Sequence, residues 1–403
     1  MPSAFDRFAA LATDSAPGQE VRQSTGDVGA LMRGEPMAGP LVDFSHGDVD
    51  AFTPAPGALE AFSQAVEAGG RQAYTEYRGA ADIRAALAER LAVFTGAPVS
   101  PDAGTIVTPG TQGALFLALG ALVAPGDKVA IVQPDYFANR KIVQFLGGVP
   151  VPVPMDYLGT STEAGLELDR LRDVFAAGAK VFLFSNPNNP TGVVYSAREI
   201  RAIADLAGQF DVTVVADQLY SRLLYDGETY THLRACGLAD ERVVTIMGPS
   251  KTESLSGYRL GIAFGAPSII DRMEKLQAIV SLRAAGYNQA VLRTWFCEPE
   301  GWMANRIRLH QAVRDDMLQL FRAGGLPTRT PKAGSYLFPT LPDLAVSLSD
   351  FVRLLRHQAQ VIVTPGTEFG PHDHSIRLNF SQGHASAVAA ARRIVAMAQL
   401  YRR

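Results

Sequence analysis

Residues 180–220 read KVFLFSNPNNPTGVVYSAREIRAIADLAGQFDVTVVADQLY, and this stretch decides the fold. Two short apolar runs, VFLFS and VTVVAD, flank the helical segment SAREIRAIADLAGQF. Runs that are apolar on both faces are typical of parallel strands buried between helices. Parallel strands also need a long crossover connection, which is usually a helix. The stretch therefore predicts a strand–helix–strand unit of an open α/β sheet.

The same alternation continues on both sides of this unit. The runs GTIVT, KVAIVQ, VPVPM, RVVTIMG and RLGIAFG predict further strands, with helical stretches between most of them. We expect a large, doubly wound α/β domain with a mostly parallel sheet over residues 51–290, and a smaller α+β domain over residues 291–403. Residues 1–50 are predicted to form an arm that packs on the small domain or on a dimer partner.

Composition narrows the class of protein. The chain has 403 residues and a net charge of -3, which argues against a general nucleic-acid binder. No stretch approaches the roughly 20 apolar residues that a membrane-spanning helix needs. The two cysteines, Cys236 and Cys297, cannot build a disulfide framework, and the N-terminus does not resemble a signal peptide. We expect a cytoplasmic protein without a metal site.

Polar residues follow several predicted strands, which is where ligands bind in open α/β sheets. After the run VTP, a turn at Gly110 leads into a predicted helix. The free N–H groups of Thr111 and Gln112 at the start of this helix would face an anion. An ordinary strand-to-helix turn without a ligand is the alternative. The prolines of NPNNP would hold the amide of Asn189 in place. Tyr136 follows another strand and could pack against a flat ligand.

Charged residues lie at the ends of, or inside, buried strands. Asp217 ends the apolar run VTVVAD, where a buried carboxylate needs a cationic partner. The alternative is that Asp217 caps the N-terminus of a following helix. Lys251 follows RVVTIMG, and Arg259 comes eight residues later. Arg377 lies within the apolar run SIRLNFS, where arginine usually pairs with a carboxylate of a ligand or of the protein itself.

The sequence resembles the fold-type-I pyridoxal-phosphate enzymes, specifically the class I/II aminotransferases. The motifs that carry this resemblance are NPNNPTG, ADQLY, the pair SK followed eight residues later by Arg259, and RLNFS. The resemblance covers the chain from about Val42 to Phe380. It implies pyridoxal 5'-phosphate as cofactor, a homodimer with shared active sites, and transfer of an amino group between an α-amino acid and a 2-oxo acid.

The resemblance also implies a role for each motif residue. Lys251 matches the lysine that forms the Schiff base and moves the proton, and Asp217 matches the carboxylate that keeps the pyridine nitrogen protonated. The remaining matches are the phosphate ligands Gly110, Thr111, Gln112, Ser250 and Arg259, with Tyr74 of the partner subunit; the stacking ring Tyr136; the donors Asn189 and Tyr220 to the phenolic oxygen; and the substrate-carboxylate ligands Arg377, Asn189 and Gly47.

The sequence departs from the family pattern at three positions. Gly248 stands where many relatives have a phosphate-binding serine, which Ser250 could replace. Glu76 and His46 replace residues that are more often small or apolar, and we hypothesise that one of them selects a polar or basic substrate group; solvated surface positions are the alternative. A second cation for a distal substrate carboxylate could come from Arg283, Arg78 or Arg140.

The motifs leave the reaction open. Transamination is the leading interpretation, but relatives with the same lysine, aspartate and arginines catalyse elimination, replacement or cyclisation of the aminocyclopropane-carboxylate-synthase type. A non-enzymatic regulator is disfavoured because no DNA-binding pattern precedes the fold. A degenerate pseudoenzyme is disfavoured because Lys251, Asp217 and Arg377 are all present.

Overall fold

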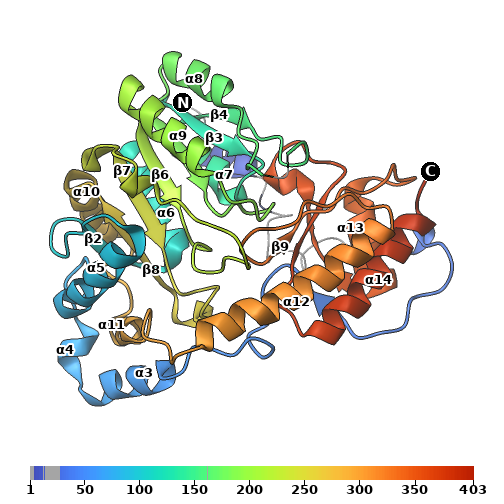
Figure 1. Ribbon diagram of the computed structural model, residues 1–403, viewed down its shortest axis with the longest axis horizontal. Coiled ribbons are helices and arrows are strands. Elements are labelled where there is room, and N and C mark those ends of the chain that lie inside the picture. The colour runs from blue at the N-terminus through green and yellow to red at the C-terminus, as the bar shows by residue number, and fades with distance from the viewer. Residues whose placement is uncertain (1–3, 12, 14–27, 161) are drawn as a thin grey trace.

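The computed structural model describes residues 4–11, 13, 28–160 and 162–403. Its centre is a seven-stranded sheet with the strand order β2-β8-β7-β6-β5-β3-β4 (Figure 1). All the strands predicted for the large domain are present. They are β2 (Thr105–Pro109), β3 (Lys128–Gln133), β4 (Val149–Pro154), β5 (Val181–Ser185), β6 (Thr213–Asp217), β7 (Val243–Met247) and β8 (Leu260–Gly265).

The sheet is parallel except for β8, which runs antiparallel to both β7 and β2. The predicted α/β class with a mostly parallel sheet is thus confirmed. Only a loop and the short 3-10 helix η4 (Ser256–Tyr258) join β7 to β8, so no helical crossover returns the chain for parallel pairing. As a result, the start of β8 lies at the same sheet edge as the carboxyl ends of the other strands.

Helices cover both faces of the sheet. In strand β5, alternate side chains pack against different helices on the two faces. Val181 and Leu183 pack with α6 (Gly110–Leu122), α7 (Phe137–Phe145) and α10 (Pro267–Val280). Phe182 and Phe184 point to the other face and pack with α8 (Leu168–Ala176) and α9 (Ala197–Phe210). Burial of side chains on both faces explains why this strand lacks polar alternation.

Local signals in the sequence set the ends of two helices. Helix α9 begins with a capping box, in which the Ser196 side chain accepts from the Glu199 N–H and the Glu199 carboxylate accepts from the Ser196 N–H. Helix α5 (Ala81–Thr95) ends at Gly96, whose φ of 71° places it in the left-handed region. Helix α5 packs on the short helix η5 (Ala290–Arg293), which also contacts α3 (Ala58–Glu67) and α11 (Gly286–Gln289); α4 (Gly70–Ala73) packs with these two helices.

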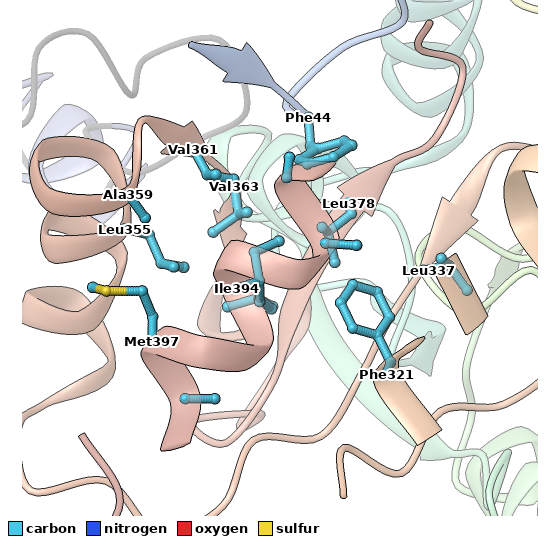
Figure 2. Packing of buried hydrophobic residues seen from close by; sticks show 14 of the residues in the cluster. Phe44, Phe321, Leu337, Leu355, Ala359, Val361, Val363, Leu378, Ile394 and Met397 are labelled. Atoms are coloured by element: carbon cyan, nitrogen blue, oxygen red, sulfur yellow. The ribbon is translucent and has the colours of Figure 1, made fainter. Parts of the chain in front are cut away.

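A second hydrophobic core lies in the C-terminal part of the chain. Phe321, Leu337, Leu378 and Ile394 pack together in it (Figure 2). The elements around this core are α12 (Trp302–Ala323), α13 (Leu348–Ala359) and α14 (His384–Leu400), with β9 (Tyr336–Leu337), β10 (Val361–Ile362), β11 (Thr364–Pro365) and β12 (Ile376–Asn379). Strands β9, β12 and β11 form one antiparallel sheet.

The N-terminal residues contact both parts of the molecule. Helix α1 (Ala4–Leu11) packs on α7, where the ring centroids of Phe8 and Phe145 are 5.9 Å apart. Helix α2 (Val28–Leu31) contacts α13, and β1 (Val42–Asp43) pairs in parallel with β10. Residues 1–3, 12 and 14–27 of the predicted arm lie outside the described residues.

The described part of the chain lacks two kinds of feature, membrane-spanning helices and metal-binding clusters. No helix there is long and apolar enough to cross a bilayer. No group of three or more His, Cys, Asp or Glu side chains there is arranged to hold a metal ion.

Candidate active site

A cavity lies at the sheet edge where the parallel strands end and β8 begins. The strand ends supply residues to it in chain order, with Thr111 after β2, Tyr136 after β3, Asn189 after β5 and Asp217 at the end of β6. The full lining is Ser45, His46, Thr111, Gln112, Leu115, Tyr136, Phe137, Ser185, Asn189, Asp217, Leu219, Tyr220, Ser250, Lys251, Arg259, Tyr336 and Arg377.

One end of the cavity is suited to an anion. The first turn of α6 brings Thr111 and Gln112 to the cavity, and the N-cap residue of this helix has no side-chain cap. Arg259 and Ser250 line the same cavity. Free N–H groups, the helix dipole and a guanidinium together are the donors that a phosphate group prefers.

Glycines keep this end open. A Cβ on Gly248 would lie 2.8 Å from the Thr111 Cγ2 atom, and a Cβ on Gly261 would clash with the backbone of the turn at Gly110 and Thr111. Gly110 itself has a φ of 79° and lies against the Arg259 guanidinium. The glycine at position 248, where relatives often have serine, therefore allows the turn after β2 to approach the loop after β7.

Asp217 faces the cavity from the end of β6. Its Oδ1 atom accepts a hydrogen bond from the Leu219 N–H at 3.1 Å, which is not enough to satisfy a buried carboxylate. Burial raises the pKa of Asp217 to about 6, although the Leu219 N–H acts in the opposite direction. A protonated ring nitrogen would supply the missing donor and restore the carboxylate charge.

Arg377 is almost fully buried and turns its guanidinium into the cavity. It donates to Asn189 Oδ1 at 3.2 Å, to the Ser45 carbonyl at 3.1 Å and to Thr364 Oγ1 at 3.4 Å. No ion pair involves it among the described residues, and its Nε atom has no hydrogen-bond partner there. The internal salt bridge considered above is therefore not formed, and the guanidinium can accept a ligand carboxylate.

These residues fit pyridoxal phosphate. The cavity has donors for a phosphate at one end, an under-satisfied carboxylate for a ring nitrogen, and a lysine, Lys251, in the same lining. Tyr136 is placed beside Phe137, with ring centroids 4.8 Å apart, and its hydroxyl donates to Gln112 Oε1 at 3.0 Å. Because Asn189 Oδ1 is occupied by Arg377, its amide N–H groups remain available as donors.

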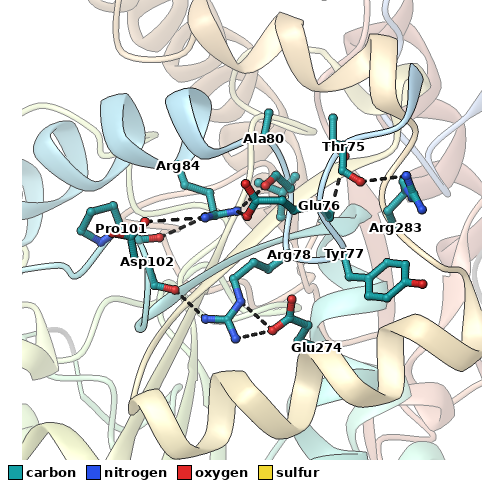
Figure 3. Close-up of polar contacts among 12 residues, drawn as sticks. Thr75, Glu76, Tyr77, Arg78, Ala80, Arg84, Pro101, Asp102, Glu274 and Arg283 are labelled. Atoms are coloured by element: carbon teal, nitrogen blue, oxygen red, sulfur yellow. Dashed lines mark hydrogen bonds and ion pairs between the residues drawn. The ribbon is translucent and has the colours of Figure 1, made fainter. Parts of the chain in front are cut away.

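Gly47, Tyr74 and Glu76 do not line this cavity. Gly47 lines an adjoining cavity with Lys251 and Arg259. Tyr74 is 82% exposed, and Glu76 forms an ion pair with Arg84 at 2.8 Å (Figure 3). Within one protomer, the segment that contains Tyr74 and Glu76 is directed away from the cavity.

His46 lies at the cavity lining, beside Asp43. Its Nδ1 atom faces the Gly47 carbonyl at 3.0 Å and its Nε2 atom faces Asp43 Oδ2 at 3.4 Å, so both ring nitrogens point to acceptors. The hydrogen bond to Asp43 raises the pKa of His46 to about 9. An imidazolium at this position favours an acidic rather than a basic substrate group.

Several lining residues were not found from the sequence. They are Ser45, Leu115, Phe137, Ser185, Leu219 and Tyr336. Asp135 was also missed; it does not line this cavity but accepts from the Ser185 N–H at 2.9 Å and from the Tyr136 N–H at 2.6 Å. Burial raises the pKa of Asp135 to about 7.

Comparisons with known proteins agree with this arrangement. Residues 40–394 match the family model described as aminotransferase class I and II. The probable aspartate/prephenate aminotransferase of Thermus aquaticus is 33% identical over 349 residues, which is 85% of this chain and 88% of the relative. These matches support transamination and do not favour the elimination, replacement or cyclisation alternative.

Solved structures are similar over the whole chain. The crystal structure of an aspartate aminotransferase from Rhodobacter sphaeroides has a TM-score of 0.96 and 62% identity and covers 100% of both chains. The Thermus thermophilus aspartate aminotransferase with maleate has a TM-score of 0.84 and 27% identity, covering 98% of this chain and 100% of the other.

Proposed function

The chain belongs to the class I and II aminotransferases, which depend on pyridoxal phosphate, and we propose that its amino donor is a dicarboxylic amino acid such as aspartate. Two observations support this substrate class. A structural neighbour with 62% identity is described as an aspartate aminotransferase, and another was solved with maleate, which is a dicarboxylate. The cationic His46 at the cavity lining is also compatible with an acidic substrate.

Arg377 supports an amino-acid substrate most directly, because it is a buried guanidinium without an ion pair among the described residues. We assign it to the substrate α-carboxylate. When bound, pyridoxal phosphate supplies an aldehyde and a ring that withdraws electrons from the substrate α-carbon. Lys251 would hold the cofactor at its aldehyde carbon, with loss of water, and its amine would carry the proton between substrate and cofactor once the substrate amine has replaced it there, while Asp217 would hold the ring nitrogen protonated.

We assign the distal carboxylate to Arg283 of the partner subunit. Of the three candidates, Arg78 is paired with Glu274 at 2.7 Å, and Arg140 donates to the Glu368 carbonyl and lines a different cavity with Asp135 and Phe369. Arg283 donates to the Thr75 carbonyl at 2.7 Å and has no ion pair within the described ranges (Figure 3). Its guanidinium lies 5.6 Å from the Tyr74 ring centroid, so it would accompany Tyr74 to the partner's site.

A homodimer with shared sites is part of the proposal. The surface near Tyr74 exposes apolar side chains at the end of α10, with Ile279 82% and Leu282 54% exposed. Exposed apolar patches of this kind mark interaction surfaces. Size-exclusion chromatography with light scattering tests the dimer, and fractionation of cells tests the predicted cytoplasmic location.

Steady-state kinetics test the substrate class. We expect the loaded enzyme to have a kcat/KM for aspartate that is about 100-fold above that for alanine, with 2-oxoglutarate as acceptor, since a charge-assisted pair contributes roughly 1.5–3 kcal/mol. Arg283→Ala should remove most of this preference and leave the alanine reaction unchanged. Arg272→Ala is the control, because Arg272 lies in α10, the helix that precedes Arg283, and its hydrogen bonds in the described structure go only to the backbone carbonyls of Ser268 and Ala121. Equal rates with both donors in the parent enzyme would refute the proposed substrate class.

A further inference from the structure

Tyr336 is a cavity residue for which neither the family motifs nor the proposed function gives a role. It lies in β9 of the C-terminal part, is 4% exposed, and lines the cavity with Lys251 and Arg377. Its hydroxyl is 2.7 Å from the hydroxyl of Tyr220, which belongs to the large sheet region. The two ring centroids are 5.4 Å apart with an interplanar angle of 78°. The two phenols therefore form a buried pair across the two parts of the molecule.

The neighbours of the pair determine which hydroxyl is the donor. Asn379 accepts at Oδ1 from the Ser381 N–H at 3.0 Å, and this contact identifies the other end of the amide as the donor. Asn379 is the partner of Tyr336 in the β12–β9 ladder, so the two side chains lie on the same face, and the Asn379 amide acts as a donor that lowers the pKa of Tyr336. A donor at the Tyr336 oxygen leaves the Tyr336 proton free to point to the Tyr220 oxygen.

The charges around Tyr336 also favour this phenol as the donor. The Arg377 guanidinium lies over the Tyr336 ring, 4.5 Å from its centroid. Burial opposes ionisation of Tyr336, but the charges of Arg377 and Lys251 and the hydrogen bonds outweigh it and lower the pKa of Tyr336 below its ordinary value. Burial and the neighbouring Tyr336 raise the pKa of Tyr220. The more acidic phenol is the better donor, which again makes Tyr336 the donor and Tyr220 the acceptor.

We propose that Tyr336 is a positioning residue that donates its hydroxyl proton to Tyr220 and so directs the Tyr220 proton into the cavity, toward the phenolic oxygen of the cofactor. The hydrogen bonds then run in one direction, from Asn379 to Tyr336 to Tyr220 to the ligand. A hydroxyl that accepts a hydrogen bond becomes a stronger donor itself. This inference depends on the role of Tyr220 in the proposed function.

The test is a pH titration of the absorption band of the bound cofactor, without substrate. A donor to the phenolic oxygen withdraws negative charge from it and makes protonation of the bound cofactor harder, so weakening this donor raises the midpoint. We expect Tyr336→Phe to raise the midpoint by about 0.5 to 1 pH unit, the size of one net hydrogen bond. Tyr220→Phe should raise it further, and the double variant should match Tyr220→Phe, because Tyr336 acts only through Tyr220.

The possible results separate the inference from its premise. An unchanged midpoint in Tyr336→Phe, with a raised midpoint in Tyr220→Phe, would overturn the inference alone. An unchanged midpoint in Tyr220→Phe would overturn both the inference and the assigned role of Tyr220. A raised KM for aspartate in Tyr336→Phe without a midpoint shift would show that the residue acts on Arg377 instead. If Tyr336→Phe does not fold, Asn379→Ala should raise the midpoint in the same direction by a smaller amount.

Discussion

Asp217 is a carboxylate in a cavity that supplies it with too few donors. Burial raises its pKa from 3.8 to about 6, with the Leu219 N–H as the opposing contact. A carboxyl whose folded pKa is raised above its unfolded value destabilises the fold as the pH rises above the unfolded pKa, and for Asp217 the loss begins near pH 3.8 and is complete above about pH 6. Asp217→Asn removes this ionisation and keeps an oxygen that can accept from the Leu219 N–H. We therefore expect the substitution to stabilise the cofactor-free protein at neutral and alkaline pH.

The pKa shift sets the size of the effect. A shift from 3.8 to about 6 corresponds to roughly 3 kcal/mol at pH 8, where Asp217 is ionised in both the folded and the unfolded state. The difference falls to about 1.5 kcal/mol at pH 5 and disappears below pH 3.8, where both states are protonated. Water in the cavity solvates the carboxylate, so these values are upper limits.

The assay compares the unfolding of the cofactor-free parent and Asp217→Asn proteins by urea at pH 5, 6.5 and 8. The stability gain of the variant should grow with pH. With pyridoxal phosphate bound, the order should reverse, because the ring nitrogen then pairs with the Asp217 charge. Loss of that charge-assisted bond should also lower kcat by roughly 10- to 100-fold.

A stability difference that does not change between pH 5 and pH 8 would refute the reasoning, since the gain would then come from packing rather than from ionisation. A cofactor-free variant that is less stable than its parent at pH 8 would also refute it. Ser100→Ala is a useful control, because this exposed loop serine carries no charge and does not line the cavity.

Three further predictions concern other parts of the molecule. Gly261→Ala should raise the Kd for pyridoxal phosphate at least ~10-fold in a fluorescence titration, because its Cβ clashes with the turn after β2, whereas Gly257→Ala meets nothing within 4 Å and should leave the Kd unchanged. Phe321→Ala should destabilise the C-terminal core by about 3–5 kcal/mol in urea unfolding. His46→Gln should raise the KM for aspartate roughly threefold at pH 8 relative to that for alanine, and this gap should close near pH 10 as the parent loses its charge.

The sequence predicted the large sheet region well because its strands have a strong physical signature. Each strand is a short apolar run buried on both faces, and parallel connections place the carboxyl ends at one edge. Polar residues directly after these runs, such as Thr111, Asn189 and Asp217, therefore meet in one cavity. Here the order of elements along the chain is enough to predict which residues come together.

Tyr336 shows where such reasoning fails. Strand β9 has two residues, and the segment SYLF has the composition of any buried strand, so its phenol is indistinguishable from a core aromatic. Its position next to Tyr220 depends on how the C-terminal part packs on the large sheet, which no local pattern records. Asp135 was missed for a related reason, since its partner Ser185 belongs to another strand.

Glu76 shows a different limit. An unusual charge within a family motif suggested a substrate contact, but in one protomer the Glu76 carboxylate pairs with Arg84, which also donates to the Gly79 carbonyl (Figure 3). These contacts close the turn between α4 and α5 and hold the segment that presents Tyr74. Whether Glu76 also reaches a substrate depends on the partner subunit, and Glu76→Gln tests this through the KM of each donor.

The site joins the two parts of the chain through the same residues that would bind the ligands. Arg377 from β12 donates to Asn189 after β5, and Tyr336 from β9 pairs with Tyr220 after β6. Arg377 also donates to the Ser45 carbonyl in the N-terminal segment. In the proposed function, a substrate carboxylate on Arg377 would share the guanidinium with these two acceptors, so we expect substrate binding to affect contacts between the two parts. Under the same assignments neither part alone would hold a complete site, because Lys251 and Asp217 come from one and Arg377 comes from the other.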